Sequence, residues 1–310
     1  MRVLLPALAA GAAAGSHRVA VLVSGTRSYT NATWDSLKTH VLDALEARGT
    51  AYEAFACGEP GQAVPPFATE VAASHATPEA RLAACYAAAV GKAAPRPRRW
   101  GPPRASAPFT HFLKTRPDHL WHAPPPILSR LPAARVALRA RVLVGHVRVS
   151  SDAMSWHGCG LRDGDLRPLC EHGVASLKPD GANACLILDD QVALVPACAA
   201  DAFFFSGRGT PRGAHECETQ PEDASDLRLT WNETTSAWGD GRGGAWTKCP
   251  NPTCWGGGHE TTLTRHCARR RLPLVIAAFR VRTTAAKHSL VGYPARERFF
   301  SCNASDGVLV

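Results

Sequence analysis

The sequence predicts an α/β protein whose mostly parallel sheet carries helices on both faces. Short apolar runs without regular alternation, such as residues 18–24 and 185–188, are typical of strands that are buried on both faces. These runs alternate along the chain with helical patterns, as expected where crossover helices join parallel strands. A length of 310 residues suffices for one large domain with a buried core, and we expect residues 17–310 to form it.

The first half of the chain gives clear signals for its strands and helices. Leu37, Val41 and Leu45 fall on one helical face, and Gly49 supplies a stop. Thr77 and Pro78 are suited to the cap and first turn of a second helix. The predicted elements are a strand over 18–24, a helix over 34–48, a strand over 51–56, a loop over 58–76 and a helix from 77 to about 90.

The next predicted strand, Phe109–Leu113, ends at a cluster of charges. Pro117 cannot donate to a ladder, so the strand has to stop near Arg116. Lys114, Arg116 and Asp118 therefore lie where the sheet gives way to a loop. Ligands bind at such carboxyl ends in open α/β sheets, although surface ion pairing explains the charges equally well for a single strand.

The second half is predicted to contain another strand of the same design. Residues 185–188 form a short apolar run that ends in Asp189, Asp190 and Gln191. Two adjacent carboxylates at a strand end are costly unless they meet a cation, a metal or a sugar hydroxyl. The other predicted elements are a strand over 135–144, a helix over 196–205, a long disulfide-held loop over 206–258, a helix over 258–271 and a buried strand over 273–281.

Residues 150–180 are expected to form a long loop, or excursion, that disulfides tie to the domain. We expect the same of other cysteine-bearing loops. This segment contains a literal D-x-D, Asp163 to Asp165, in a polar stretch without a preceding strand. We interpret that motif as a turn.

The formal net charge of +9 favours small anionic ligands such as diphosphates. Only 6 of the 35 basic residues are lysine, which indicates a compositional bias toward arginine. No zinc finger, basic helix or RNA-binding aromatic signature accompanies the charge, so nucleic acid is not an expected partner.

The N-terminus predicts entry into the secretory pathway. Arg2 precedes the apolar stretch 3–14, and small residues suited to cleavage follow, so residues 1–16 have the layout of a secretory signal peptide. Asn31, Asn232 and Asn303 begin glycosylation sequons. Eleven cysteines suit disulfides in an oxidising compartment. We expect a glycoprotein that is secreted or lies in the ER or Golgi lumen, without a membrane span.

Four short motifs together resemble a known group of proteins. They are Arg-Val-Ala-Val-Leu-Val-Ser-Gly at 18–25, Lys-Thr-Arg-Pro-Asp at 114–118, Leu-Asp-Asp-Gln at 188–191 and Gly-His-Glu at 258–260. In this order they resemble an uncharacterised eukaryotic glycosyltransferase-like family, related to nucleotide-diphospho-sugar transferases of the GT-A fold. The likeness covers roughly residues 18 to 300 in order of elements. It implies a Rossmann-like GT-A fold, a nucleotide-sugar donor and a glycan or protein acceptor.

The resemblance also implies where the donor binds. The loop after the first strand, with Ser24, Gly25 and Arg27, would hold the nucleotide, and Arg116-Pro117-Asp118 would stand in the place of the family's D-x-D. Asp118 would then hold Mn²⁺ or Mg²⁺. Arg116 replaces the first acid of that motif, which departs from the family pattern and from ordinary metal dependence.

The chemistry of glycosyl transfer assigns roles to the remaining candidates. Charge builds on the leaving diphosphate, and a metal or side chains such as Lys114 and Arg116 must stabilise it. The acceptor hydroxyl needs a carboxylate base, for which Asp189 or Asp190 is the first candidate and Glu260 the reserve. Gln191 completes the candidate substrate-binding residues, with Ser24, Gly25, Arg27, Lys114 and Arg116.

Three alternatives remain open from sequence. The first is a secreted carbohydrate-binding relative without turnover. The second is a zinc site, whose candidate ligands are Cys249, Cys254, His259, His266 and Cys267; disulfides suit these cysteines better in an oxidising lumen. The third is a hydrolase, but the usual hydrolase motifs are absent from the sequence. Neighbouring Asp189 and Asp190 would also point to opposite faces of an extended strand, which is poor geometry for a facing pair of glycosidase acids.

Overall fold

A computed structural model describes residues 17–25, 30–58, 61, 63–72, 77–91, 109–144, 147–150, 184–204, 227–241, 243–248, 258–277, 279 and 281–283. The predicted signal peptide, the excursion with its D-x-D, Arg27 and Asn303 lie outside these residues.

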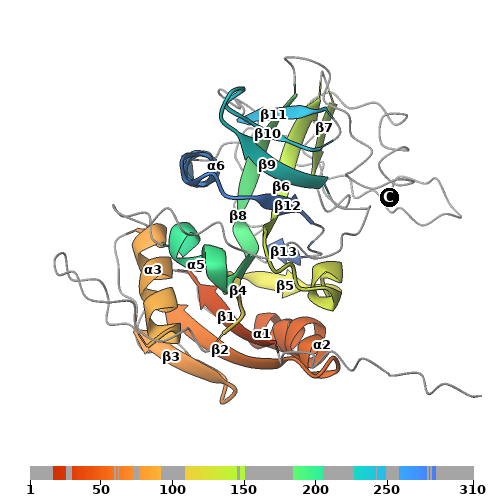
Figure 1. The fold of residues 1–310 in the computed structure, drawn as a ribbon. Coiled ribbons are helices and arrows are strands. Elements are labelled where there is room, and N and C mark those ends of the chain that lie inside the picture. The colour runs from red at the N-terminus through yellow and green to blue at the C-terminus, as the bar shows by residue number, and fades with distance from the viewer. Residues whose placement is uncertain are drawn as a thin grey trace, which may run out of the picture.

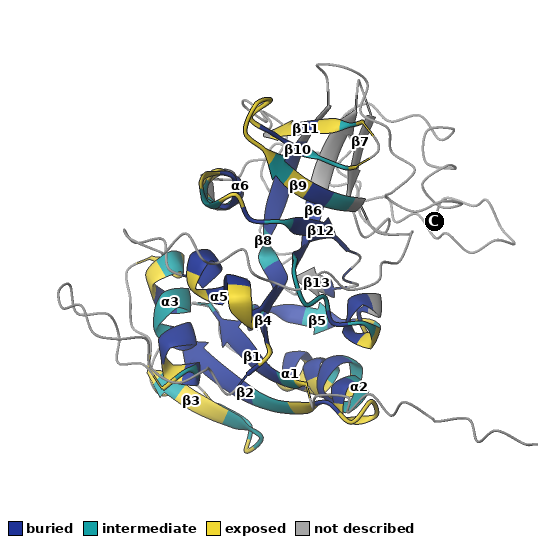
Figure 2. Ribbon diagram, in the orientation of Figure 1, coloured by how far each residue is buried: buried dark blue, intermediate teal, exposed yellow. Residues whose placement is uncertain are grey.

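The first part of the chain folds as a parallel sheet between two layers of helices (Figure 1). Its elements are β1 (Arg18–Ser24), α1 (Asn31–Leu37), the π-helical η1 (Lys38–Leu42), α2 (Asp43–Glu46), β2 (Ala51–Gly58), β3 (Ala68–Ala72), α3 (Pro78–Ala89) and β4 (His111–Thr115). The strand order is β3-β2-β1-β4, with all neighbours parallel. Strand β3 lies in the stretch predicted as a loop, where its largely exposed edge position leaves little hydrophobic signal (Figure 2).

The predicted burial of β1 on both faces is confirmed. Ala20 and Leu22 belong to one core cluster, with side chains of α3 and α5 (Ala197–Phe204). Val19, Val21 and Val23 alternate with them and belong to the other cluster, with side chains of α1, η1 and α2. Helices therefore cover both faces of this part of the sheet, as expected.

The helix boundaries follow from their caps. The Thr30 side chain accepts a hydrogen bond from the backbone N–H of Thr33 at 3.2 Å. Thr77 caps α3 in the same way, through the N–H of Ala80 at 3.2 Å, with Pro78 in the first turn. Gly49 adopts φ +69° just after α2, as the predicted stop requires.

The second part of the chain makes the sheet mixed rather than mostly parallel, which corrects the prediction. Its elements are β5 (His119–Trp121), the 3₁₀ turn η2 (Pro126–Ser129), β6 (Val136–Val144), β7 (Val147–Ser150), β8 (Ala184–Pro196), β9 (Leu227–Asn232), β10 (Ala237–Gly239), β11 (Ala245–Lys248), α6 (Gly258–Arg270), β12 (Leu274–Ile276) and β13 (Val281–Thr283). Strand β8 runs antiparallel to both β4 and β6. The short connections from β6 to β7 and through β9, β10 and β11 also give antiparallel pairs, because parallel pairs need long crossovers.

The pairings of β8, β11, β10, β9, β12 and β6 close on themselves. Strand β8 pairs with β11 at one side and with β6 at the other, so the six strands form a ring beside the parallel part (Figure 1). Strands β9 to β11 lie in the stretch predicted as a long loop, and the predicted last strand divides into β12 and β13. Strands β9, β10 and β11 were missed because they are short and because tryptophan, threonine and glycine interrupt their apolar pattern.

Strand β8 is longer than predicted, and this places the acidic pair differently. It continues past Leu188 to Pro196, so Asp189 and Asp190 lie within the strand and not at its end. Leu188 pairs with Ala140 of β6 and Ala193 pairs with Leu138. The β8 residues from Asp189 to Val192 thus bulge opposite a single residue of β6, Arg139.

Among the described residues, a disulfide joins Cys57 of β2 to Cys85 of α3, and Cys267 is a buried free cysteine. No described helix is long and apolar enough to cross a membrane.

Candidate functional site

The candidate site lies at the carboxyl ends of β1 and β4. The chain continues from β1 to β2 on one side, while β4 lies on the other, so the strand order reverses at this point. Such a reversal leaves a crevice beyond the strand ends in open α/β sheets. A cavity of about 850 Å³ opens here, and its floor includes Ser24 and Gly25 at the end of β1 and Arg116, Pro117 and Asp118 after β4.

The cavity lining contains more basic than acidic side chains. Helices α3 and α6 and the end of β4 supply six basic side chains, and three carboxylates line the same space. The basic residues are Arg81, Lys114, Arg116, Arg265, Arg269 and Arg270, and the acids are Glu79, Asp118 and Asp190. A cavity with this excess of positive charge suits a small ligand with several negative charges.

Arg116 and Asp118 form a two-pronged ion pair on the cavity floor. Arg116 Nε donates to Oδ1 of Asp118 at 2.9 Å, and its Nη2 donates to Oδ2 at 3.0 Å. Burial works against the charged guanidinium, but the hydrogen-bonded Asp118 carboxylate, with the charges of Asp190 and Asp189, outweighs burial and raises the pKa of Arg116. Both oxygens of Asp118 are thus engaged by a cation, and its side chain is 3% exposed. In this structure Arg116 therefore occupies both oxygens of Asp118, the residue for which the family resemblance implies a metal-ligand role.

His119 contacts the turn that contains Arg116 and Asp118. The backbone N–H of Arg116 donates to Nδ1 of His119 at 3.4 Å, and the Thr115 hydroxyl lies 2.9 Å from the same atom. Burial, with the nearby charges of Arg139 and Arg116, lowers the pKa of His119 to about 3. The imidazole is therefore neutral with Nδ1 as the acceptor, which suits a positioning role.

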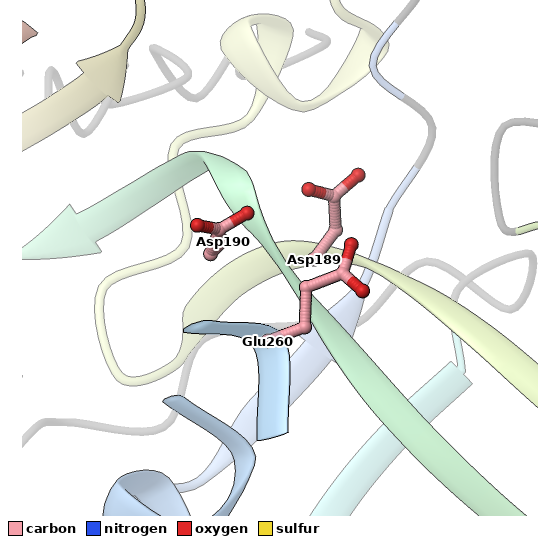
Figure 3. Close-up of side chains that lie close together, drawn as sticks. All are labelled: Asp189, Asp190 and Glu260. Carbon is pink, nitrogen blue, oxygen red and sulfur yellow. The ribbon is translucent and has the colours of Figure 1, made fainter. Parts of the chain in front are cut away.

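Asp189, Asp190 and Glu260 form a carboxylate cluster next to the cavity (Figure 3). One oxygen from each lies within 4.8 Å of the others, so the three could together hold a metal ion. The expectation that the neighbouring aspartates point away from each other on an extended strand is therefore wrong for this bulged stretch. Of the three, Asp190 alone lines the described cavity, while Asp189 and Glu260 are 4% and 7% exposed.

Arg139 neutralises Asp189, one of the two buried members of this cluster. Its Nη2 lies 2.5 Å from Oδ2 of Asp189 and donates to Oε1 of Gln191 at 3.0 Å. Nη1 donates to the carbonyl of Val281 at 3.1 Å. The bulge is thus folded around one buried guanidinium, and Gln191 contacts that guanidinium instead of lining the cavity.

Thr264 brings Glu260 to the same place. Its hydroxyl donates to the carbonyl of Glu260 at 2.8 Å and accepts from the backbone N–H of Leu188 at 2.9 Å. This bridge fixes the first turns of α6 against β8 just before the bulge. Glu260 therefore reaches Asp189 although 71 residues separate them in the sequence.

Lys114 joins the cluster to the cavity. Its ammonium donates to the carbonyl of Asp190. Burial lowers the pKa of Lys114, against the opposing influence of the Asp190 and Asp189 carboxylates. A cation with a lowered pKa and an acid thus adjoin at the edge of the cavity.

Most of the sequence-predicted residues come together. Ser24, Gly25, Lys114, Arg116, Asp118 and Asp190 line one cavity, and the other described candidates, Asp189, Gln191 and Glu260, lie behind it. Sequence reasoning missed Arg139 and the arginines of α3 and α6. A charged residue in the apolar run of β6 was the available signal for Arg139, and the four-residue spacing of Arg265 and Arg269 was the signal for a basic face on α6.

The structure describes only part of two further sequence hypotheses, the zinc site and the glycosylation sequons. His266 Nε2 donates to the carbonyl of Ala202 at 2.8 Å, whereas the zinc candidates Cys249 and Cys254 lie outside the described residues. Asn31 is exposed at the start of α1 and does not line the cavity, so a glycan on it would not grow from the cavity wall.

Comparisons of the chain with protein-family models, with curated proteins and with solved structures found no match.

Proposed function

We propose that the protein is a glycosyltransferase, which moves a sugar from a nucleotide-diphospho-sugar to a hydroxyl of a glycan or protein acceptor. The observation that carries this proposal is the cavity of about 850 Å³ at the ends of β1 and β4. It combines six basic side chains with three carboxylates, of which Asp190 lies next to Lys114. Leaving-group stabilisation and proton removal are the two tasks of this reaction.

The residues divide these tasks between them. Asp190 takes the proton of the acceptor hydroxyl as the new bond forms between the hydroxyl oxygen and the anomeric carbon of the sugar. The bond from that carbon to the diphosphate oxygen breaks, and the electron pair leaves with the diphosphate. Lys114 and Arg116 stabilise the negative charge that develops there. Asp189 is a positioning residue, because its ion pair with Arg139 fixes the bulge that carries Asp190.

The compartment proposed for this reaction is the secretory lumen. The disulfide between Cys57 and Cys85 supports an oxidising environment, in which such bonds persist. The four motifs that resemble the GT-A group support the assignment as a transferase. Three of them contribute residues to the cavity, and the fourth, at 258–260, supplies Glu260 behind it.

The test is release of nucleoside diphosphate from a panel of UDP- and GDP-sugars, with and without glycan acceptors. Asp190→Asn should lower turnover by about 10²-fold or more, since it removes the base but keeps the shape. Asp43→Asn is the matched control, because Asp43 pairs with Lys38 on the surface of α2. Glycan binding without any affinity for nucleoside diphosphates would instead support the non-catalytic carbohydrate-binding alternative.

A further inference from the structure

The cavity floor combines an anion-binding group with a carboxylate that is already neutralised. Arg116 holds both oxygens of Asp118 within 3.0 Å. A divalent cation on Asp118 would have to share these oxygens with the guanidinium and would be repelled by it. The position at which the resemblance implies a metal ligand is thus occupied by an internal cation.

The internal cation is held in a fixed place. His119 and Thr115 anchor the turn on the buried side, and Pro117 packs on Gly25 between the two charged residues. A neutral His119 with its lowered pKa does not compete with a bound anion for Arg116. The guanidinium is therefore preorganised, which reduces the entropy lost when an anion binds.

Further positive charge surrounds this floor on three elements. Lys114 lies at the end of β4, Arg81 is 3% exposed in the first turns of α3, and Arg265 and Arg269 are exposed one turn apart on α6. All of them line the same cavity. Positive charge on several sides is the arrangement that a diphosphate needs when no metal bridges its oxygens.

The carboxylate cluster is placed unfavourably for a metal that bridges a diphosphate in this cavity. Only Asp190 lines the cavity, and Asp189 faces the Arg139 guanidinium at 2.5 Å. An ion bound by all three acids would lie next to Arg139, with two of its ligands behind the cavity wall.

We propose that the cavity binds the diphosphate of its donor through arginine and lysine side chains, without a divalent cation. This inference rests on the proposed function, since it names how that donor is held. Arg116 takes the place of the metal, and Asp118 is its positioning residue. Lys114 and the α6 arginines complete the anion site.

Calorimetric titration of the full chain tests this directly. UDP, GDP and inorganic pyrophosphate are titrated in buffer with EDTA and in buffer with Mn²⁺. Binding of at least one nucleoside diphosphate in EDTA, with a Kd that changes less than about threefold on adding Mn²⁺, is the expected result. Binding that occurs only with Mn²⁺ overturns metal-free binding and leaves the proposed transferase intact. Absence of nucleoside diphosphate binding in both buffers overturns both.

Matched variants locate the site. Arg269→Gln should weaken nucleoside diphosphate binding in EDTA about tenfold, as expected for one charge-assisted contact. Arg271→Gln is the control, because Arg271 pairs with Glu233 on the surface and does not line the cavity. Arg116→Gln should weaken binding at least as much in EDTA and make the remaining affinity respond to Mn²⁺. Equal affinity of all three variants with the wild type contradicts the assignment, and unchanged thermal unfolding of Arg269→Gln excludes a folding defect.

Discussion

Gly25 and Pro117 are in direct contact across the ends of β1 and β4. A Cβ atom on Gly25 would lie 2.6 Å from Cδ and 2.9 Å from Cγ of Pro117. These distances are shorter than real contacts allow, and the proline ring cannot turn away as a long side chain would. The two strands can therefore bring their loops together only if position 25 has no side chain. The contact fixes where Arg116 and Asp118 stand.

Gly25→Ala should therefore displace the Arg116–Asp118 turn. We expect a loss of about 1–3 kcal/mol in the free energy of unfolding, as for overpacking, and weaker binding of nucleoside diphosphates. Chemical denaturation and calorimetry measure the two effects. Gly239→Ala is the matched control, because a Cβ there meets nothing closer than 3.8 Å. Similar behaviour of the two variants would show that the contact with Pro117 carries no weight.

Removing Arg139 should destabilise the protein strongly. Arg139→Met leaves Asp189 buried without its cation, which costs about 3–5 kcal/mol for a buried pair. Adding Asp189→Asn should restore part of that loss, because the unpaired charge disappears. A double-mutant cycle by denaturant unfolding measures the coupling. Lys38→Gln, which breaks the half-exposed pair with Asp43, should cost about 1 kcal/mol or less. A loss of that small size for Arg139→Met would contradict the role of Arg139 in holding the bulge.

Acid should destabilise the fold through two buried histidines. Burial lowers the pKa of His111 to about 4, and burial with nearby arginines lowers that of His119 to about 3. Above pH 6.5 both histidines are neutral in the folded and the unfolded chain, so their burial does not reduce the free energy of unfolding. As pH falls from 6.5 toward 3, the unfolded state takes up protons first, and each histidine removes up to about 1.4 kcal/mol per pH unit.

Denaturant unfolding between pH 7 and 4 checks this pH dependence. His119→Gln should be less stable than the wild type at pH 7 and lose less stability on acidification. Parallel curves for His119→Gln and the wild type would mean that His119 does not titrate as its burial requires.

Alkaline pH should weaken anion binding at a lower pH than an ordinary lysine would. Burial lowers the pKa of Lys114 below its usual 10.5, so the ammonium is lost earlier as pH rises. The affinity for UDP should fall with that loss of charge, as calorimetry over a pH series would show. Lys114→Arg keeps its charge and should flatten the dependence. An unchanged pH profile in Lys114→Arg would assign the effect to another group.

The sequence by itself determined the local structure of the first part and the grouping of most site residues. The continuous apolar run of β1, the cap at Thr77 and the proline after β4 act through neighbours in the chain, so their consequences can be read from spacing. Because parallel strands end at the same edge of a sheet, the loops after β1 and β4 could be expected to meet.

Only the tertiary structure decided how the acids and cations pair. Asp189 meets Arg139 through the bulge of β8, and Glu260 arrives through the bridge that Thr264 makes to Leu188. Register and bulges depend on the pairing of distant strands, and such pairing leaves no periodic trace in the sequence. The same holds for the ion pair between Arg116 and Asp118, because a motif specifies which side chains are present but not which of them meet.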